Sequence, residues 1–307
     1  MRHIATLAIV LAVAGSSFAQ SRSASKDADP AEPVRKAAEA GSVRAMVLLG
    51  VMYEEGRGIA KDDAEAAKWY RKAADAGDSA AMNNLGAMYA KGQGLSKDDV
   101  IATDWYRKAA EAGSAQAMSN LGARYAYGLG VQRNDVEAVK WYRKAADGEN
   151  VFGMRHLGFM YQYGRGIAKD EVEAVKWYRA AVKAGGDAYS MSCLGKMYED
   201  GRGMQKDEGE AVKWYRKAAE AGDPSGMYYL GTMYERGGGV SKDNADAARW
   251  YRKAADAGEF RAMFQLGFMY EKGDGVSKDA NEAIKWYRKA STVDPQASKA
   301  LERLEKQ

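Results

Sequence analysis

His156 and Cys193 are the one pair of side chains in this sequence that offers a base beside a thiol nucleophile. They occupy the same position in two adjacent copies of an internal repeat, so stacking of the copies would make them neighbours. A catalytic thiol also needs a third group that orients its base, and none is identifiable. One cysteine and two histidines, of which His3 lies in a segment expected to be removed, cannot assemble the usual His/Cys metal site. We therefore expect no enzyme, no metal and no cofactor.

Two short motifs suggest chemistry that the rest of the sequence does not complete. Ser23 and Lys26 have the Ser-x-x-Lys spacing of penicillin-recognising enzymes, but no Lys-Thr-Gly accompanies them. Gly56-Arg57-Gly58 and its equivalents resemble a phosphate-binding loop, but no strand precedes them and no Lys-Ser or Lys-Thr follows. We interpret the Gly-x-Gly motif as the end of a helix followed by a turn.

The sequence repeats itself. All seven tryptophans precede a tyrosine, at intervals of 36 residues with a single interval of 37. A second marker, Leu-Gly with a Tyr four residues after the Leu, keeps the same spacing, and two markers in one register predict seven tandem repeats. The Trp-Tyr pairs begin at Trp69, Trp105, Trp141, Trp177, Trp214, Trp250 and Trp286, and the Leu-Gly pairs at Leu49, Leu85, Leu121, Leu157, Leu194, Leu230 and Leu266.

Each repeat predicts two helices. The first carries Leu-Gly, and its internal glycine, such as Gly50, costs about 1 kcal/mol relative to Ala, which predicts a close helix approach there. The second begins at an acidic or amide cap such as Asp62, with Glu65 three residues later in the arrangement of a reciprocal capping box.

The second helix has one apolar face. Its Trp, Tyr and small residues recur at the spacing of a buried stripe, and its Lys and Arg residues fall opposite on what we expect to be a solvated face. A net charge of +4 from 46 basic and 42 acidic residues is close to balance, so nothing requires nucleic acid.

The two ends differ from the repeats. Residues 4–13 form a short apolar run after a basic start, and Ala19 ends a small-x-Ala pattern, which together predict a cleaved signal peptide. We expect an exported protein, periplasmic or secreted, without stable membrane insertion. The expected organisation is a signal peptide at 1–19, a disordered lead-in at 20–32, an N-terminal half repeat at 33–41, seven repeats at 42–293 and a C-terminal capping helix at 294–307.

Differences between the copies predict where a partner binds. On the first helix the constant positions occupy one arc of a helical wheel, and the variable positions occupy the other. Of 19 tyrosines, 14 belong to the two markers, and the remaining five lie on the variable arc with four phenylalanines. Such rings give large contact areas at low entropic cost, so we expect a groove for an extended segment of a partner protein, although these rings would instead widen the core if they packed between repeats. The expected partner-binding residues are Asn84, Asn120, Tyr127, Phe152, His156, Phe159, Tyr163, Tyr189, Tyr228, Tyr229, Phe264 and Phe268.

The motifs Leu-Gly-x-Met-Tyr-x-x-Gly-x-Gly and Ala-x-Lys-Trp-Tyr-Arg-Lys-Ala-Ala-x-x-Gly resemble the Sel-like repeat family, a relative of the tetratricopeptide repeats. The resemblance implies an all-α fold: a right-handed α/α superhelical solenoid of seven helix-turn-helix repeats, with the first helices on the concave side. It also implies a scaffold or adaptor that binds a protein or peptide, regulatory or envelope-related in exported bacterial members.

Two other functions stay open. Some exported members of the family interact with penicillin, but those are rich in cysteine and this chain has one. The alternatives are therefore a penicillin-interacting hydrolase and a self-associating structural protein. We expect a monomer, with self-association through the aromatic groove as the competing state.

Overall fold

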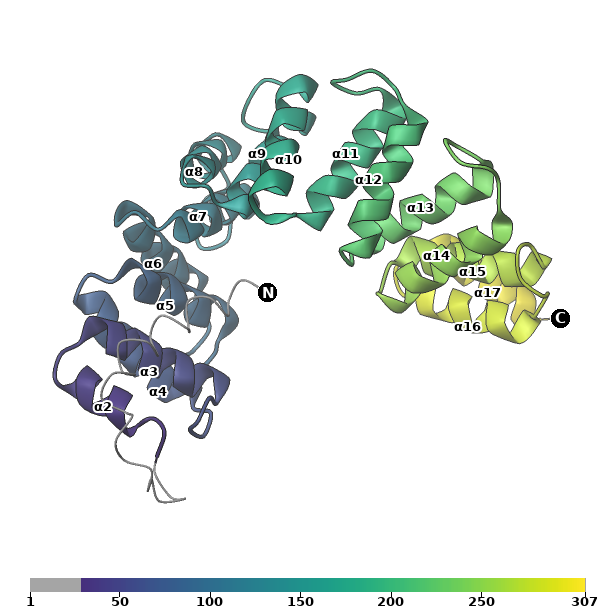
Figure 1. The fold of residues 1–307 in the computed structure, drawn as a ribbon. Helices are drawn as coiled ribbons and strands as arrows, with labels where there is room; N and C mark the ends of the chain where they lie inside the picture. The colour runs from purple at the N-terminus through teal and green to yellow at the C-terminus, as the bar shows by residue number, and fades with distance from the viewer. Residues whose placement is uncertain (1–28, 307) are drawn as a thin grey trace, which may run out of the picture. The chain divides into compact units, whose positions relative to one another are not determined.

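The computed structural model describes residues 29–306, and the expected signal peptide, the Ser23/Lys26 motif and most of the lead-in lie outside them. The described residues form the α-helices α2 to α17 and no strand (Figure 1). The chain divides between Asp98 and Asp99 into two compact units. An all-α solenoid of paired helices was the expected fold, and it is confirmed.

The helices follow the 36-residue period. The first unit contains α2 (Glu32–Glu39), α3 (Val43–Glu55), α4 (Asp63–Asp75) and α5 (Ser79–Lys91). The second contains α6 (Asp99–Glu111), α7 (Ala115–Tyr127), α8 (Asp135–Asp147), α9 (Val151–Tyr163), α10 (Glu171–Gly185), α11 (Ala188–Asp200), α12 (Glu208–Glu220), α13 (Pro224–Arg236), α14 (Asn244–Asp256), α15 (Phe260–Lys272), α16 (Ala280–Ala290) and α17 (Pro295–Glu305).

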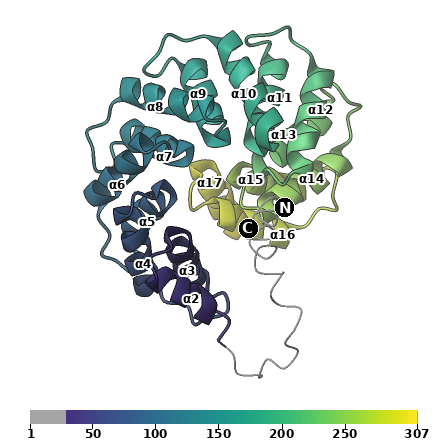
Figure 2. The ribbon, with the colours of Figure 1, turned by 60° about the vertical axis from the view of Figure 1, so that its left-hand side comes forward.

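Within each unit a helix packs mainly against the helices before and after it in the chain. In the second unit α7 also packs against α9, and α11 against α13, so the first helices of these two pairs of repeats touch directly. Figure 2 shows α7, α9, α11, α13 and α15 toward the inside of the arc that this unit forms, with α8, α10, α12 and α14 outside. Side chains on the first helices therefore share one continuous face.

The second helices have the predicted N-cap hydrogen bonds but lack the reciprocal bond of a capping box. The Asp62 carboxylate accepts hydrogen bonds from the backbone N–H groups of Ala64 and Glu65 at 2.9 and 3.0 Å, as an N-cap should. The reciprocal bond from Glu65 is absent, because the Asp62 N–H donates instead to the carbonyl of Tyr53 on the preceding helix. Glu65 pairs with Lys68, and both arrangements recur in later repeats. The further side-chain caps are Asn134, Asp170, Asp207, Asp243 and Asp279.

Both glycines of the Gly-x-Gly motif have structural reasons. The first ends its helix in the left-handed conformation, as at Gly201 with φ +70°. The second, Gly203 with φ +67°, lies against the preceding repeat: a Cβ there would be 2.2 Å from the carbonyl oxygen of Glu171. The turn interpretation is confirmed, and the second glycine also lets two repeats approach through their backbones.

The core forms where the sequence places Leu-Gly and Trp-Tyr. A Cβ on Gly195 would be 2.6 Å from the ring of Tyr215, which is fully buried, and the glycines at the same position in five other repeats meet the equivalent tyrosines. The close helix approach is thus confirmed. The lysine face is less solvated than expected, because Lys253 lies 4.1 Å from the ring centroid of Trp250 and six repeats have the same stack.

The ends of the described chain have their own packing. Ala38 of α2 is buried in a cluster with Leu49 and Trp69. At the other end, Leu301 and Leu304 of α17 pack against the buried cluster that contains Tyr287 of α16. The repeat with the single extra residue has a longer second helix: α10 has 15 residues where α8 has 13, and Gly186 caps it in the left-handed conformation.

Candidate functional site

Three successive first helices of the second unit form a hollow of about 250 Å³. The last residue of α7 lies on one side, α9 supplies the floor, and the second residue of α11 lies on the other side. We call this the α9 hollow. It is lined by Tyr127, Arg155, His156, Phe159 and Tyr189. Four of these five residues are in the predicted partner-binding set.

His156 forms part of the floor as a neutral ring. It stacks on Tyr142 with the ring centroids 4.9 Å apart and an angle of 18° between the planes. Burial lowers the pKa of His156 to about 4, and the positive charge of Arg155 lowers it further in the same direction. At neutral pH the imidazole is therefore an aromatic surface with one N–H donor, and it carries no charge.

Arg155 is the lining residue that the partner-binding prediction omitted. Its guanidinium lies 4.7 Å from the ring centroid of Phe152 and 5.5 Å from that of Tyr189, and it pairs with Asp187 at 3.1 Å. Asp187 is itself held as the N-cap of α11 by the backbone N–H of Ser190. The signal was present in the repeats, because Arg155 is the one charged residue in a column otherwise filled by Val, Asn, Ser, Tyr and Phe.

The rim of the hollow is aromatic and exposed. Tyr127 is 61% exposed and Tyr163 is 56% exposed. Tyr163 leans on Phe159 with ring centroids 4.6 Å apart, and Phe152 and Tyr189 are exposed on either side of Arg155. Aromatic rings that are exposed to this extent are typical of contact surfaces.

A second group of predicted residues packs differently. Tyr229 stacks on the buried Tyr215 at 5.0 Å, and Phe264 approaches the buried Tyr287 at 5.6 Å. Tyr228 lies 5.7 Å from the ring of Tyr251, and all three of the surplus rings are half-buried. This group therefore extends the core toward the surface, and the guanidinium of Arg261 covers Tyr228 and Tyr229.

The remaining predicted residues are not brought into the hollow. Phe268 is exposed on α15 beside Lys272. Asn84 belongs to the first unit, where it is hydrogen-bonded to the Tyr70 hydroxyl. Asn120 is half-buried on α7.

The thiol of Cys193 is poorly suited to nucleophilic attack. Burial raises its pKa to about 12, so the protonated form persists at neutral pH. The side chain packs among Tyr178 and Tyr189, and His156 is occupied in its stack on Tyr142. Within residues 29–306, no group of three or more His, Cys, Asp or Glu residues gathers in a way that would hold a metal ion.

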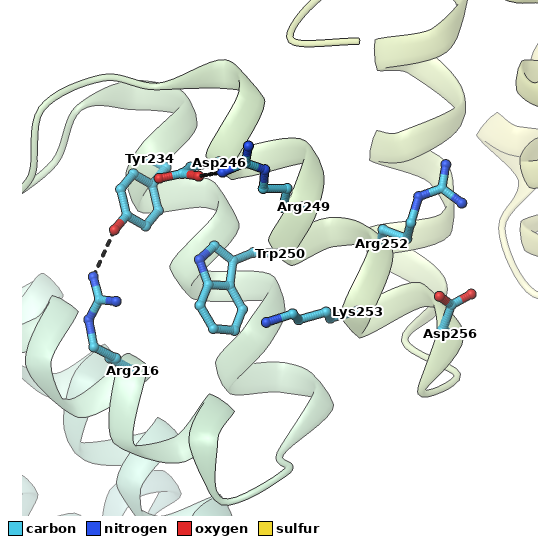
Figure 3. Close-up of a pocket in the computed structure, with 8 residues that line it drawn as sticks. All are labelled: Arg216, Tyr234, Asp246, Arg249, Trp250, Arg252, Lys253 and Asp256. Atoms are coloured by element: carbon cyan, nitrogen blue, oxygen red, sulfur yellow. Dashed lines mark hydrogen bonds and ion pairs between the residues drawn. The ribbon is translucent and has the colours of Figure 1, made fainter.

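A larger hollow, of about 530 Å³, lies on the second-helix side around α14 (Figure 3). Its floor repeats a motif of the whole solenoid, since Lys253 covers Trp250 as lysines cover tryptophans in other repeats. Arg216 donates to the Tyr234 hydroxyl at 2.7 Å. Arg249 pairs with Asp246 at 2.7 Å. Because Arg216 and Arg249 already have partners and the Lys-Trp stack is common to most repeats, we regard the α9 hollow as the better candidate site.

No helix within the described part of the chain is both long and apolar enough to cross a membrane.

Comparisons with known proteins agree with this architecture. The Sel1 repeat model matches seven times, at residues 43–78, 79–114, 115–150, 151–186, 188–223, 224–259 and 260–292. A Sel1 repeat protein from Oxalobacter formigenes is 33% identical with a TM-score of 0.72, over 89% of this chain and 79% of that one. No curated protein gives a significant match.

A protective antigen of uropathogenic Escherichia coli that displays an SLR fold is also 33% identical, with a TM-score of 0.65. The match covers 88% of this chain and 66% of that structure, so the chain spans about two thirds of its length. Seven family matches in one register, together with these two structures, show that the chain belongs to the Sel1 repeat family, whose members are generally protein-interaction scaffolds.

Proposed function

We propose that this protein is an exported scaffold that binds an extended segment of a partner protein along the first-helix face of residues 99–306. The observation that carries the proposal is the α9 hollow, which is lined by side chains of three successive first helices and has the exposed rings of Tyr127 and Tyr189 on opposite sides. Rigid aromatic side chains on stable helices contribute contact area at little entropic cost. Direct packing of α7 on α9 and of α11 on α13 supports a binding face that continues from one repeat to the next.

Several features support a binding role in preference to catalysis. The thiol of Cys193 is protonated and the imidazole of His156 is neutral and stacked, so the one nucleophile and base pair is not activated. The rings at the rim are exposed, whereas core rings of the same helices are not. Export is supported by the signal-like residues 1–19, and one relative is a protective antigen.

The test replaces three exposed rings together, in Tyr127→Ala, Tyr163→Ala and Tyr189→Ala. The tagged full-length chain is recovered from the exported fraction, and proteins bound to it are compared between variants by mass spectrometry. We expect the triple variant to lose the partner while its melting temperature stays within a few degrees of the original, because these rings are exposed.

The matched control removes exposed apolar side chains from the second helices. Val136 and Val172 are both 52% exposed, and changing both to Ala should leave the partner bound. Loss of the partner in this control, or its retention in the triple variant, would contradict the proposed surface. Absence of the chain from the exported fraction would contradict export.

A further inference from the structure

The buried tyrosine of the Trp-Tyr motif normally has a hydrogen-bond acceptor on the first helix, 16 residues earlier. That acceptor is a glutamate in four repeats and a glutamine in a fifth. The hydroxyls of Tyr70, Tyr178, Tyr215, Tyr251 and Tyr287 donate to Glu54, Gln162, Glu199, Glu235 and Glu271 over 2.5 to 3.1 Å. Leaving a buried hydroxyl without such a partner lowers the stability of the fold, which explains why the pairing recurs.

Tyr106 and Tyr142 are the two exceptions to this pattern, because an alanine stands 16 residues before each of them. Tyr142 is the one that packs against a residue of the α9 hollow. The residue 16 positions earlier is Ala126, which has no polar side-chain atom, and no hydrogen-bond partner for the Tyr142 hydroxyl exists among residues 29–306. The residue is only 1% exposed. Its hydroxyl oxygen is not one of the fully enclosed unpaired atoms in that part of the chain, so the little exposure that Tyr142 retains includes this oxygen.

The unpaired hydroxyl lies beside the α9 hollow. His156, which forms the floor of the hollow, stacks directly on the Tyr142 ring. Two of the groups whose charges act on the Tyr142 hydroxyl, Tyr127 and Arg155, also line the hollow. Burial raises the pKa of Tyr142 well above its usual value, so the hydroxyl remains a donor at every physiological pH.

The Ala126 position also lacks the negative charge that most of the paired repeats have there. In four other repeats the position of Ala126 carries a glutamate. The alanine therefore removes both a hydrogen-bond acceptor and a negative charge from the place where the partner surface is most open.

We propose that the α9 hollow receives an acidic side chain, Glu or Asp, from the partner segment, and that this carboxylate accepts the Tyr142 hydroxyl in place of the missing glutamate. Apolar residues on either side of the acid pack on the exposed rings of Tyr127 and Tyr189. This inference rests on the proposed function, because it describes the chemistry of the segment that the first-helix face binds.

The test uses two synthetic probes, the capped peptide Gly-Phe-Glu-Phe-Gly and the same peptide with Gln in place of Glu. Their affinities for the full-length protein are measured by isothermal titration calorimetry. A hydrogen bond to a charged acceptor is stronger than one to a neutral amide, so we expect the Glu peptide to bind about tenfold or more tightly than the Gln peptide. Equal affinities, or no binding of either peptide at millimolar concentration, would overturn the proposal.

Two variants locate the effect. Tyr142→Phe removes only the hydroxyl, and Ala126→Glu supplies an internal carboxylate; each should bring the affinity ratio of the two peptides close to one. Ala126→Glu should also keep or raise the melting temperature, which separates occupation of the site from loss of the fold. The control is Tyr215→Phe, whose hydroxyl is already bonded to Glu199, and it should leave the ratio unchanged. A tenfold preference that survives in Ala126→Glu would contradict the assignment.

A third probe, 3-phenylpropionate, distinguishes a free acid from a peptide. Competition by this acid as effective as that of the Glu peptide would overturn a peptide ligand, whereas competition at least tenfold weaker supports it. The outcomes also separate the two proposals. If the triple ring variant loses the partner but the peptides show no preference for Glu, the binding face stands and the carboxylate assignment fails.

Discussion

His156 is a titratable group whose folded environment favours the neutral form. Its pKa falls from 6.5 to about 4 because the ring is buried on Tyr142 beside Arg155. Between these two values the unfolded chain binds a proton that the folded chain does not, so the free energy of unfolding decreases as the pH falls from 6.5 to about 4. The negative charge of Asp187 raises the pKa of His156, but this effect is smaller than the lowering by burial.

We expect His156 to contribute about 2–3 kcal/mol to the loss of stability over this interval. The measurement is urea unfolding of the original chain and of His156→Gln at several pH values from 7 to 4. Glutamine is a suitable replacement because Gln265 occupies the same position in the last repeat. The variant should show a flatter dependence on pH. Parallel curves for the two proteins would show that His156 titrates normally in the folded state.

Some residue-level features cannot be predicted from a repeat pattern. Arg124 stands where most repeats have Met, and it is buried with its side chain bonded to Thr103 at 2.9 Å and to the Asp99 carboxylate at 2.6 Å. The pattern marks this position as core but does not reveal that two helices changed together. The surplus rings are similar: all share one arc in sequence, yet Tyr163 is exposed and Tyr229 stacks on the core, because the neighbouring repeat decides which space remains.

At the scale of the element, the pairs of markers predict the helices well. The Trp-Tyr and Leu-Gly motifs locate the buried stripes, and the caps and glycines locate the ends, because each of these features acts within a few residues of sequence. The prediction of a reciprocal capping box was wrong because of a residue further away in the sequence. The Asp62 N–H donates to the Tyr53 carbonyl on the preceding helix, so it is not available to Glu65. The close contact of Gly203 with Glu171 joins two repeats, and a contact between repeats cannot be predicted from the sequence pattern within one of them.

This contact leads to a prediction about two glycines with similar backbone conformations. Gly203 has φ +67° and faces the Glu171 carbonyl, whereas Gly222 has φ +88° and nothing lies within 4 Å of an added Cβ. Gly222→Ala should cost about 1–2 kcal/mol from left-handed strain alone. Gly203→Ala should cost about 3 kcal/mol or more, because the clash adds to the same strain.

Urea unfolding of the two single variants measures the difference directly. Equal losses of stability would mean that the contact between repeats relaxes freely and that only the backbone conformation of the glycine matters.

At the scale of the whole molecule, a stack of repeats must end without exposing its core. Each repeat packs mainly on its neighbours, so the last one has a free face unless another element covers it. In the second unit α17 provides this cover: Ala297 is fully buried against α16, and Leu301 and Leu304 pack on the same cluster. Without α17, the ring of Tyr287, now 1% exposed, would be uncovered.

We therefore expect removal of residues 295–307 to lower the free energy of unfolding by about 2–4 kcal/mol, from the lost burial of two leucines and an alanine. Without α17, the apolar face of α16 should also make the protein self-associate, which sedimentation at increasing protein concentration would detect. The control is Arg303→Ala. This change removes the 2.5 Å ion pair between Arg303 of α17 and Glu271 of α15 but keeps the apolar contacts of α17. Because exposed ion pairs contribute about 0–1 kcal/mol, this variant should remain stable and monomeric. A truncated chain with unchanged stability and no self-association would show that α16 already closes the stack, and that the leucines of α17 contribute little to its end.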